Sequence, residues 1–462
     1  MPVPVITVAQ MREWENSSWE MGKEMGAVMR QAAAAVAQRL HQLSRRNDPI
    51  LFLAGPGNNG GDTRLAADMM RGRPVELLNI NDSQSALPAL RQALGRRPAW
   101  VVDGLFGIGL NRPLEGLWLE LVEAVNATGL PVLAVDVPSG LDADHGKPMG
   151  GAIRAMETIT FGAPKTGMVS DAAAEWVGRL CVAHDIGLVD CSVKGDLEWV
   201  LREDFRDFPP PRAATGHKGD FGHLGILAGS GGFHGAAVLA ARGALRAMPG
   251  LVSVVTLDEA YGPVASQLAA AMVHRWPVDL DCDGWLVGPG LATVEAEEAM
   301  QAEVVRLWRE FPGPVVVDAS ALAWLPENEV AIEAPRVITP HPGEAARMLG
   351  MNAPEVQADR LAALRTLAQS RGSCQVVLKG RNTLTGGATG KVAINPTGNV
   401  GLAQGGSGDV LAGLIAGLMV QPALRKDVDK TLRWAAWRHG VAADRLSARR
   451  RAWTAEDLAH TV

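Results

Sequence analysis

Apolar and polar positions follow two alternating patterns along the chain, which together predict an α/β protein. Residues 8–43 place apolar side chains at helical spacing and include an alanine-rich stretch at 32–37, which favours one or two helices. Further along, short apolar runs end in Gly, Asp or Pro and precede helical stretches. This pattern is typical of buried parallel strands, because helices cover both faces of the sheet. In the first half the runs are 50–54, 75–78, 100–102, 132–137, 158–161 and 180–183.

The same pattern restarts after an interruption at 205–218, which is rich in proline and basic residues and which we interpret as a linker. The strand-like runs of the second half are 224–228, 251–256, 285–287, 315–317, 337–339 and 376–378, followed by a hairpin at 382–394 and helices at 408–420 and 430–446. The sequence therefore predicts two α/β domains, at 1–208 and 214–462, and the first is a Rossmann-like, doubly wound domain.

Composition and charge exclude several classes of protein. Hydrophobic residues make up 47% of the 462 residues and charged residues 20%, as in a globular protein. The net charge of −6 argues against a nucleic-acid binder. The four cysteines form no C-x-x-C pair, which argues against a metal cage or a redox couple. An apolar run of membrane-spanning length and a signal peptide are not seen, so we expect a cytoplasmic protein with no membrane partner; a homo-oligomer is compatible with the sequence.

A glycine-rich turn follows the first predicted strand. Segment 55–62 reads Gly-Pro-Gly-Asn-Asn-Gly-Gly-Asp and opens a predicted helix. Its glycines allow close backbone approach to a ligand, and a helix N-terminus attracts phosphate. The segment lacks the Gly-Lys-Ser/Thr ending of a P-loop. A ligand-free turn and, with the glycines read as G-x-G-x-x-G, a plain NAD-dependent dehydrogenase remain as alternatives.

Two aspartates follow other strands of the same predicted sheet. Asp103 comes after the run at 100–102, and Asp136 lies at the end of the run at 132–137. Because ligands bind beyond the carboxyl ends of strands in open α/β sheets, we expect both aspartates to lie beside Asn59. Either aspartate alone is often only a helix cap. Two of them beside glycine-rich loops favour a binding site.

The motifs at 57–62, 103–109 and 136–140 resemble those of the NAD(P)H-hydrate epimerase family, and segments 161–167 and 185–187 resemble its later motifs. Thr63 stands where the family usually has glycine. The resemblance implies a potassium ion held by Asn59, Asp103 and Ser139. It also implies a hydrated nucleotide bound by Asn58, Asn59, Gly60, Gly61, Asp62, Gly107, Ile108, Gly109, Leu110, Asn111, Arg112, Pro113 and Asp136.

The chemistry of this family fits such a site. Water added at C6 of the nicotinamide ring gives R and S epimers, and their interconversion requires reversible loss and return of the hydroxyl through an iminium-like cation. A carboxylate near C6 can pass protons and stabilise that cation. We expect Asp136 to be this catalytic group.

The most specific motif of the chain is Gly-Gly-Ser-Gly-Asp at 405–409, at the start of a predicted helix. Its glycines expose backbone amides to a phosphoryl group, and Asp409 can accept a proton from an attacking hydroxyl. The alternative is an acidic residue that only stabilises the helix N-terminus. The Gly-x-Gly-Asp arrangement resembles the ribokinase superfamily, so we expect a ribokinase-like second domain.

Other segments resemble one branch of that superfamily, the NAD(P)H-hydrate dehydratases, over 215–462. They are 229–237, 288–291, 339–344, 376–380 and 395–399. The resemblance implies dehydration driven by ADP or ATP with Mg²⁺, and substrate contacts at Ala237, Gly290, His341 and Asp409. It implies that Lys379, Gly380, Arg381, Asn382, Thr383 and Gly408 bind the adenine nucleotide. Taken alone, His341 is more often a capping or core histidine.

Together the two resemblances imply a bifunctional repair enzyme that epimerises NADH and NADPH hydrates and dehydrates the S form. One alternative is a ribokinase-superfamily small-molecule kinase with a non-catalytic N-terminal domain. Another is an interaction module, which predicts a degraded glycine turn and a basic surface, and the sequence has neither. The choice between ADP and ATP, and between the two hydrates, is left open.

Overall fold

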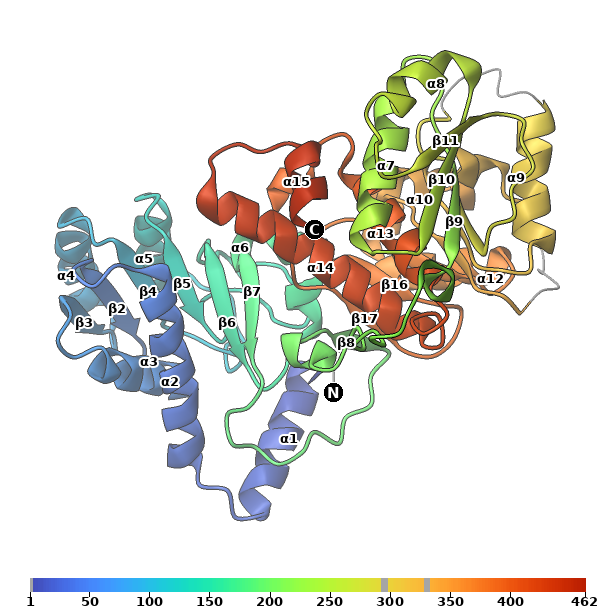
Figure 1. Cartoon of the computed structure of the whole chain (residues 1–462). Helices are drawn as coiled ribbons and strands as arrows, with labels where there is room; N and C mark the ends of the chain where they lie inside the picture. Colours follow the sequence, from blue (N-terminus) through green and yellow to red (C-terminus); the bar gives the residue numbers. More distant parts are fainter. Residues whose placement is uncertain (1–2, 292–297, 328–332) are drawn as a thin grey trace. The chain divides into compact units, whose positions relative to one another are not determined.

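The computed structural model describes residues 3–291, 298–327 and 333–462 (Figure 1). The chain forms two compact units, Val3–Asp196 and Leu197–Val462. The division falls earlier than the predicted boundary at 208. Among the described residues, no helix combines the length and apolar character that a membrane span requires.

The first unit is built on a sheet in the order β3-β2-β4-β5-β6-β7, in which every pairing is parallel. The strand order reverses between β2 and β4, and in doubly wound folds this switch point is where ligands bind. The strands of this sheet are β2 (Ile50–Ala54), β3 (Val75–Asn79), β4 (Trp100–Gly104), β5 (Val132–Val135), β6 (Glu157–Phe161) and β7 (Arg179–Ala183). A short strand, β1 (Val3–Pro4), precedes α1 and is not part of this sheet. The apolar runs predicted as strands in this half are confirmed.

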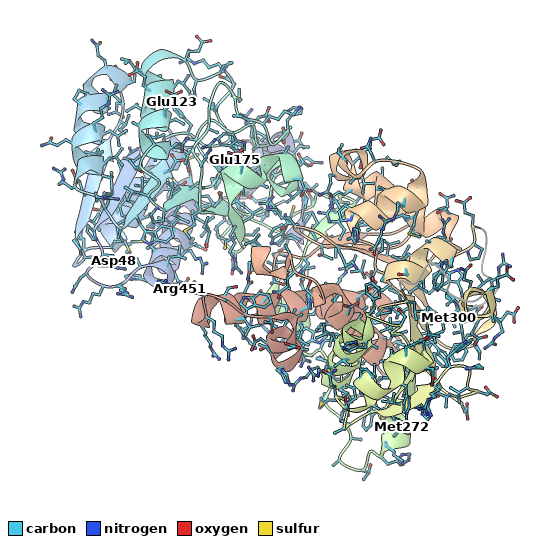
Figure 2. All side chains as sticks on the ribbon, turned by 90° about the horizontal axis from the view of Figure 1, so that it is seen from above. Asp48, Glu123, Glu175, Met272, Met300 and Arg451 are labelled. Atoms are coloured by element: carbon cyan, nitrogen blue, oxygen red, sulfur yellow. The ribbon has the colours of Figure 1, made fainter. Side chains whose placement is uncertain are left out.

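Helices cover both faces of this sheet, as the continuous apolar runs predicted. On one face Ile50 and Phe52 pack with α2 and α3; on the other Leu51 and Leu53 pack with α4 and α5. The helices of this unit are α1 (Val8–Glu20), α2 (Met25–Leu43), α3 (Asn58–Met69), α4 (Ser83–Gly95), α5 (Gly116–Asn126), α6 (Ala174–Val177) and the 3-10 helices Thr166–Val169 and Asp171–Ala173. The exposed carboxylates Glu123 and Glu175 belong to α5 and α6 (Figure 2).

The second unit contains a larger, mixed sheet with the order β8-β17-β16-β15-β14-β13-β12-β9-β10-β11. The pairings from β15 to β11 are parallel, and β15, β16 and β17 are antiparallel to their neighbours in the predicted hairpin. The strands are β8 (Leu197–Trp199), β9 (His223–Leu227), β10 (Leu251–Thr256), β11 (Met272–Arg275), β12 (Gly284–Val287), β13 (Val315–Val317), β14 (Arg336–Ile338), β15 (Gln375–Leu378), β16 (Leu384–Gly386) and β17 (Val392–Ile394).

Sequence reasoning missed β8 and β11, which lie near the ends of this strand order. Met272, labelled in Figure 2, begins β11 and is exposed, and the rest of that strand is at most half-buried. A strand that buries neither face lacks the apolar run by which the other strands were recognised.

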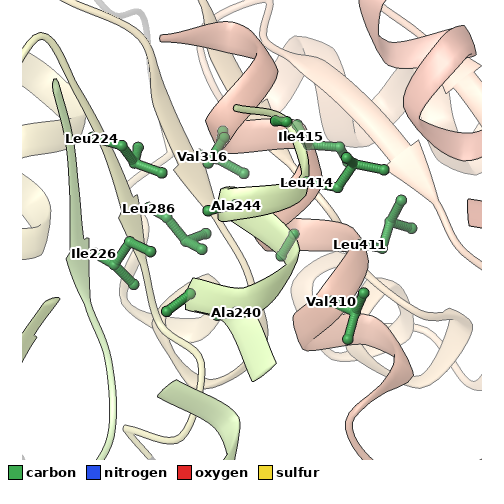
Figure 3. Packing of buried hydrophobic residues seen from close by; sticks show 14 of the residues in the cluster. Leu224, Ile226, Ala240, Ala244, Leu286, Val316, Val410, Leu411, Leu414 and Ile415 are labelled. Atoms are coloured by element: carbon green, nitrogen blue, oxygen red, sulfur yellow. The ribbon is translucent and has the colours of Figure 1, made fainter. Parts of the chain in front are cut away.

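The centre of the second unit is the packing of α7 (His234–Arg246) against α13 (Ser407–Met419) over the sheet. Figure 3 shows Ala240 and Ala244 of α7 facing the apolar side chains of α13. A Cβ atom added at Gly413 would lie 1.9 Å from the Ala240 carbonyl oxygen, so the two backbones approach closely. The remaining helices are α8 (Asp258–Ala265), α9 (Glu298–Glu310), α10 (Pro342–Leu349), α11 (Ala353–Ala358), α12 (Arg360–Ser370), α14 (Val428–Arg449), α15 (Ala455–Thr461) and the 3-10 helices Arg202–Phe205, Lys218–Phe221, Ala319–Trp324 and Val400–Leu402.

Candidate active sites

A cavity of about 560 Å³ opens at the switch point of the first sheet. The loops that follow β2, β4 and β5 all contribute to its wall. The predicted residues in the wall are Asn58, Asn59, Asp62, Gly107, Ile108, Gly109, Leu110, Asn111, Arg112 and Asp136. Among the described residues, Gly60, Gly61 and Pro113 lie outside this wall.

Helices α1 and α2 complete the cavity, which sequence reasoning did not foresee. Arg12, Glu15 and Trp19 come from α1, and Met25 and Met29 from α2. The Arg12 guanidinium donates a hydrogen bond of 3.1 Å to the carbonyl oxygen of Ile108, so α1 is tied to the loop after β4. The only signal in the sequence was the unusual mixture of charged, Met and Trp residues on an amphipathic helix.

Asp136 is held by a buried lysine. Its φ of 61° is rare for a residue other than glycine, and such strained backbone is often found at functional sites. Lys165 Nζ, which is fully buried, donates to Asp136 Oδ1 over 2.7 Å, and the Thr160 hydroxyl donates to the same oxygen over 3.0 Å. Sequence reasoning placed Lys165 inside a family-like segment but gave it no role.

Asp62, on the first turns of α3, is a second carboxyl group in the same cavity wall. The residue is 8% exposed, and its Oδ1 atom has no hydrogen-bond partner in the described part of the chain. Burial, together with the charges of Asp136 and Glu15, raises the pKa of Asp62 to about 8. Burial also raises the pKa of Glu15, and the charge of Asp136 adds to this shift.

The three residues predicted to hold a cation meet beside the carbonyl oxygen of Phe106. Asp103 is fully buried, and it accepts hydrogen bonds of 2.6 Å from the Ser139 hydroxyl and 2.8 Å from the Ser139 backbone N–H. Asn59 Nδ2 donates to the Phe106 oxygen over 3.0 Å. Burial raises the pKa of Asp103 to about 6, although the hydrogen bonds from Ser139 oppose this shift.

This arrangement fits a hard cation, because it leaves one buried oxygen unused. Asn59 Oδ1 is buried and has no hydrogen-bond partner within the described ranges. A buried polar atom without a partner is costly, and an oxygen-binding ion would satisfy it.

Thr63, which departs from the family's usual glycine, does not point at the cavity. It is completely buried, and its hydroxyl donates to the Asn59 carbonyl oxygen over 2.8 Å. On the side of β4 it packs against Gly104, where an added Cβ atom would lie 1.8 Å from the Thr63 hydroxyl. The pairing of threonine with glycine therefore keeps the turn and the sheet in contact.

The second candidate site gathers around Lys379, which follows β15. Lys379 Nζ lies 2.8 Å from Asp318 Oδ1 and 3.8 Å from Glu344 Oε2. Burial lowers the pKa of Lys379, but the charges of Asp318 and Glu344 outweigh this and raise it. Asp318 follows β13 and was missed, although it carries the same strand-end signal that identified Asp103.

Asp409 and the glycine loop lie next to this lysine. A Cβ atom added at Gly408 would lie 3.3 Å from Lys379 Nζ. Asp409 stands in the first turn of α13. Burial and the nearby charge of Asp318 raise the pKa of Asp409 to about 7, against the opposing effect of Lys379. A carboxylate with such a pKa is suited to accept a proton near neutral pH.

His341 is the N-cap residue of α10. Its Nδ1 atom accepts hydrogen bonds from the backbone N–H groups of Gly343 and Glu344, at 3.0 Å and 3.3 Å. Burial lowers the pKa of His341. The capping alternative is thus realised. The His341 side chain is half-exposed, and its Nε2 atom lies 3.5 Å from Glu344 Oε1.

The remaining predicted residues of this site differ in accessibility. Gly380, Arg381, Asn382 and Thr383 form the turn after β15. The Arg360 guanidinium donates to backbone carbonyls on both sides of this turn, at Leu378, Lys379, Arg381 and Asn382, which sequence reasoning missed. Ala237 is fully buried, and its Cβ atom lies 2.9 Å from the position of a Cβ atom added at Gly229. The Gly290 carbonyl oxygen accepts a hydrogen bond from the Ser230 hydroxyl.

Comparison with known proteins gives matches over both halves. The family model described as NAD(P)H-hydrate dehydratase matches residues 224–462, and the one described as YjeF-related protein N-terminus matches 25–94 and 75–167. The bifunctional NAD(P)H-hydrate repair enzyme of Gloeobacter violaceus is 36% identical, covering 96% of this chain and 94% of that protein. The enzyme of the same description from Escherichia coli is 35% identical, covering 89% of this chain and 84% of that protein.

Solved structures also resemble part of the chain. A ribokinase-like superfamily protein from Enterococcus faecalis is 22% identical and covers 59% of this chain and 96% of its own, with a TM-score of 0.51. This confirms the expected ribokinase-like fold. The ADP/ATP-dependent NAD(P)H-hydrate dehydratase from Bacillus subtilis, co-crystallised with ATP and Mg²⁺, is 30% identical and covers 55% of this chain and 91% of its own, with a TM-score of 0.49.

Proposed function

The chain belongs to the family of bifunctional NAD(P)H-hydrate repair enzymes, and on this premise we propose which site performs which reaction. The cavity of Val3–Asp196 binds the hydrated nucleotide and interconverts its R and S epimers. The site around Asp409 in Leu197–Val462 dehydrates the S epimer with ADP or ATP. The observation that carries the first assignment is the position of Asp136. This residue lies in the cavity wall and accepts a hydrogen bond from a buried lysine.

The epimerase site acts through Asp136. Loss of the C6 hydroxyl leaves a positive charge on the nicotinamide ring, which an adjacent carboxylate stabilises. Lys165 holds Asp136 Oδ1 in one position, so the carboxylate does not have to reorganise as the ring charge develops. The loops at 58–62 and 107–113 surround the remainder of the nucleotide.

Asn59, Asp103 and Ser139 are the proposed ligands of a potassium ion in this unit. The unused oxygen of Asn59 and the carboxylate of Asp103 support this assignment, because both are buried and both are hard donors. A bound cation would offset the buried negative charge of Asp103 and fix the loop after β4.

In the second site Asp409 accepts the proton of the C6 hydroxyl while that oxygen attacks the terminal phosphoryl group of the nucleotide. The phosphorylated oxygen then leaves readily, because the ring nitrogen's lone pair expels phosphate and the dihydronicotinamide is regenerated by loss of a C5 proton. The amides of residues 405–408 bind the transferring phosphoryl oxygens. The turn 379–383 binds the adenine nucleotide, and Arg360 keeps that turn in shape.

Three charged side chains support a phosphoryl-transfer site here. Lys379 places its ammonium group beside Gly408, where transferred oxygens gain negative charge. The carboxylates of Asp318 and Glu344 are oxygen donors of the kind that magnesium, bound with a nucleotide, prefers.

The test is to incubate the purified chain with mixed epimers of NADH hydrate, with and without ADP or ATP. We expect the epimers to interconvert without nucleotide, and the dihydronicotinamide absorbance to recover only when a nucleotide is present. A small-molecule kinase would consume nucleotide without regenerating NADH, and a dehydrogenase would transfer hydride from added NADH. Either result would refute the assignment. Omission of potassium, with sodium as replacement, should slow only the epimerisation.

A further inference from the structure

We propose that Asp62 is the acid that protonates the departing C6 hydroxyl, while Asp136 is the base that accepts a proton from the incoming water. The inference rests on the proposed epimerase function and deepens it. It assigns epimerisation to two carboxyl groups in opposite protonation states, rather than to Asp136 alone.

The two carboxyl groups line one cavity but have opposite surroundings. Asp136 Oδ1 accepts hydrogen bonds from Lys165 Nζ, the Thr160 hydroxyl and, at 3.3 Å, the Phe161 backbone N–H. Three donors, one of them an ammonium group, stabilise a carboxylate. The Oδ1 atom of Asp62 is buried in the wall and has no partner among the described residues. A buried, unpaired carboxyl group is more stable in its neutral form.

The charges around Asp62 act in the same direction. Glu15 faces it from α1 and Asp136 from the loop after β5, and both raise the pKa of Asp62 beyond the effect of burial, to about 8. The cations at the cavity are Arg12 and Arg112 in the wall, and Lys165, which is engaged by Asp136. Two acidic groups whose environments separate their protonation states provide an acid and a base at the same pH.

The reaction balances with these two groups and water. The C6–O bond breaks, its electron pair goes to the oxygen, and the oxygen takes the Asp62 proton and leaves as water. The lone pair of the ring nitrogen forms the C=N bond of the cation, which faces the charge of Asp136. A water molecule adds to C6 on the opposite face of the ring and gives its proton to Asp136. Proton exchange with bulk water restores the starting pair.

The reaction has a geometric requirement that two carboxyl groups, those of Asp62 and Asp136, satisfy. The R and S epimers carry the hydroxyl on opposite faces of the ring, so one fixed carboxyl group cannot serve departure from one face and addition to the other equally well. With the roles exchanged, Asp136 protonates the hydroxyl of the second epimer and Asp62 receives the proton of water.

The test is Asp62→Asn in the full chain, because the amide keeps the size of the side chain but cannot transfer a proton. We expect kcat for epimer interconversion to fall by about 10²–10⁴-fold, the usual cost of losing a general acid, with KM changed by less than about threefold. Dehydration of the S epimer, measured on the same preparation, should be unchanged because it is assigned to the other unit. Urea denaturation of the variant, with a native transition for the first unit, reports that this unit is folded. The matched control is Asp68→Asn on the same helix, an exposed residue paired with Arg71, which should leave both activities intact.

The pH profile separates proton transfer from a structural role. In the native chain kcat for epimerisation should decline as pH rises through about 8, because Asp62 then loses its proton. This decline should be absent in Asp62→Asn, and Asp62→Glu should recover part of the lost kcat.

Three outcomes would overturn the inference. These are interconversion by Asp62→Asn within about threefold of the native rate, a loss confined to KM, and a pH limb that persists in the amide variant. They leave the epimerase function itself standing. A native chain that does not interconvert the epimers would instead refute that function.

Discussion

At the scale of single residues, the sequence analysis named only one member of each buried lysine–aspartate pair. Asp136 was predicted because it lies at a strand end beside glycine-rich loops, and its partner Lys165 was not. The lysine follows β6, and nothing in the local pattern tells whether its side chain turns inward. In the second unit the same holds for Lys379, which was predicted, and Asp318, which was missed. Strand ends can be read from a sequence, but pairing across strands depends on side-chain direction in the folded sheet.

The buried pair of Lys165 and Asp136 gives a prediction for stability. Lys165→Met leaves a mostly buried carboxylate without its counter-charge, and breaking such a pair typically costs about 3–5 kcal/mol in the free energy of unfolding. The double variant Lys165→Met/Asp136→Asn should recover most of this loss, because neither charge then remains. The unfolding transition of the first unit in urea, followed in the single and the double variant, measures both changes in stability. A double variant as unstable as the single one would show that the lysine acts through packing and not through charge.

His439 on α14 predicts how the stability of the second unit depends on pH. Its ring is buried behind the glycine loop, with Nε2 3.0 Å from the Ser407 carbonyl oxygen. Burial lowers the pKa of His439 to about 4 from 6.5. The unfolded chain therefore binds a proton below pH 6.5 that the folded chain refuses, so stability falls as pH decreases from 6.5 towards 4.

Thermal unfolding of the native chain and of His439→Gln over this pH range tests the point. The variant should lose less stability on acidification, because glutamine does not titrate. An equal slope in both chains would mean that His439 does not control the acid sensitivity.

At the scale of elements, the sequence predicted the repeating strands and helices, but it did not predict how helices α1 and α2 contribute to the cavity. The alternating strand and helix pattern located β2, β4, β5 and β6 because these strands are buried on both faces. The edge strands β3 and β7 are mostly half-buried, but they keep enough of an apolar run to be recognised. The wall that α1 and α2 add to the cavity could not be predicted, because an amphipathic pattern identifies an apolar face and not what that face covers. For His341, local spacing in the sequence is enough to predict the capping role that the structure shows. Any role of His341 towards a ligand depends on neighbouring loops, which local spacing does not place.

The close packing of α13 on α7 predicts that replacing two different glycines by alanine will have opposite effects on stability. Gly413→Ala places a Cβ atom 1.9 Å from the Ala240 carbonyl oxygen, so the helices must separate. We expect a loss of about 1–3 kcal/mol or more and a fall in dehydration, because α13 carries Asp409. The control is Gly262→Ala in α8, where an added Cβ atom meets nothing within 4 Å and helix propensity predicts a gain of up to about 1 kcal/mol.

Melting temperature and the two activities, measured on both variants, decide this prediction. Epimerisation should be unaffected in either variant, because neither glycine belongs to the first unit. A Gly413→Ala chain with native melting and native dehydration would contradict the close approach of the two helices.

At the scale of the whole molecule, the number of units could be predicted from the sequence, but the compact units divide at a different residue. The proline-rich segment at 205–218 looked like the junction, whereas the compact units divide between Asp196 and Leu197. The reason is β8, a strand of three residues that pairs in parallel with β17. So short a strand, with Glu198 at its centre, gives no apolar run that a pattern search could detect. Its attachment to the second sheet appears only once β17 is in place.

This division leads to a prediction about separable fragments, which we propose should be cut at 196/197. In the second unit Phe205 packs edge-on against Trp434, with ring centroids 5.2 Å apart, and Trp434 stacks on Trp437 at 5.3 Å. Glu198 also accepts a hydrogen bond from Arg433 over 3.2 Å. A fragment of 214–462 loses β8, Phe205 and Glu198 together. It exposes the edge of β17 and a pair of tryptophans, and unpaired edges of this kind promote aggregation.

We therefore expect Leu197–Val462 to be stable and to dehydrate the S epimer, and 214–462 to melt at a lower temperature or to precipitate. Each aromatic pair contributes about 0.5–1.5 kcal/mol beyond the area it buries, so the loss should be readily measurable. Val3–Asp196 and 3–208 serve as the reciprocal pair, and both should epimerise, because residues 197–208 belong to the other unit. Equal stability of Leu197–Val462 and 214–462 would show that β8 is dispensable, and would return the junction to the proline-rich segment.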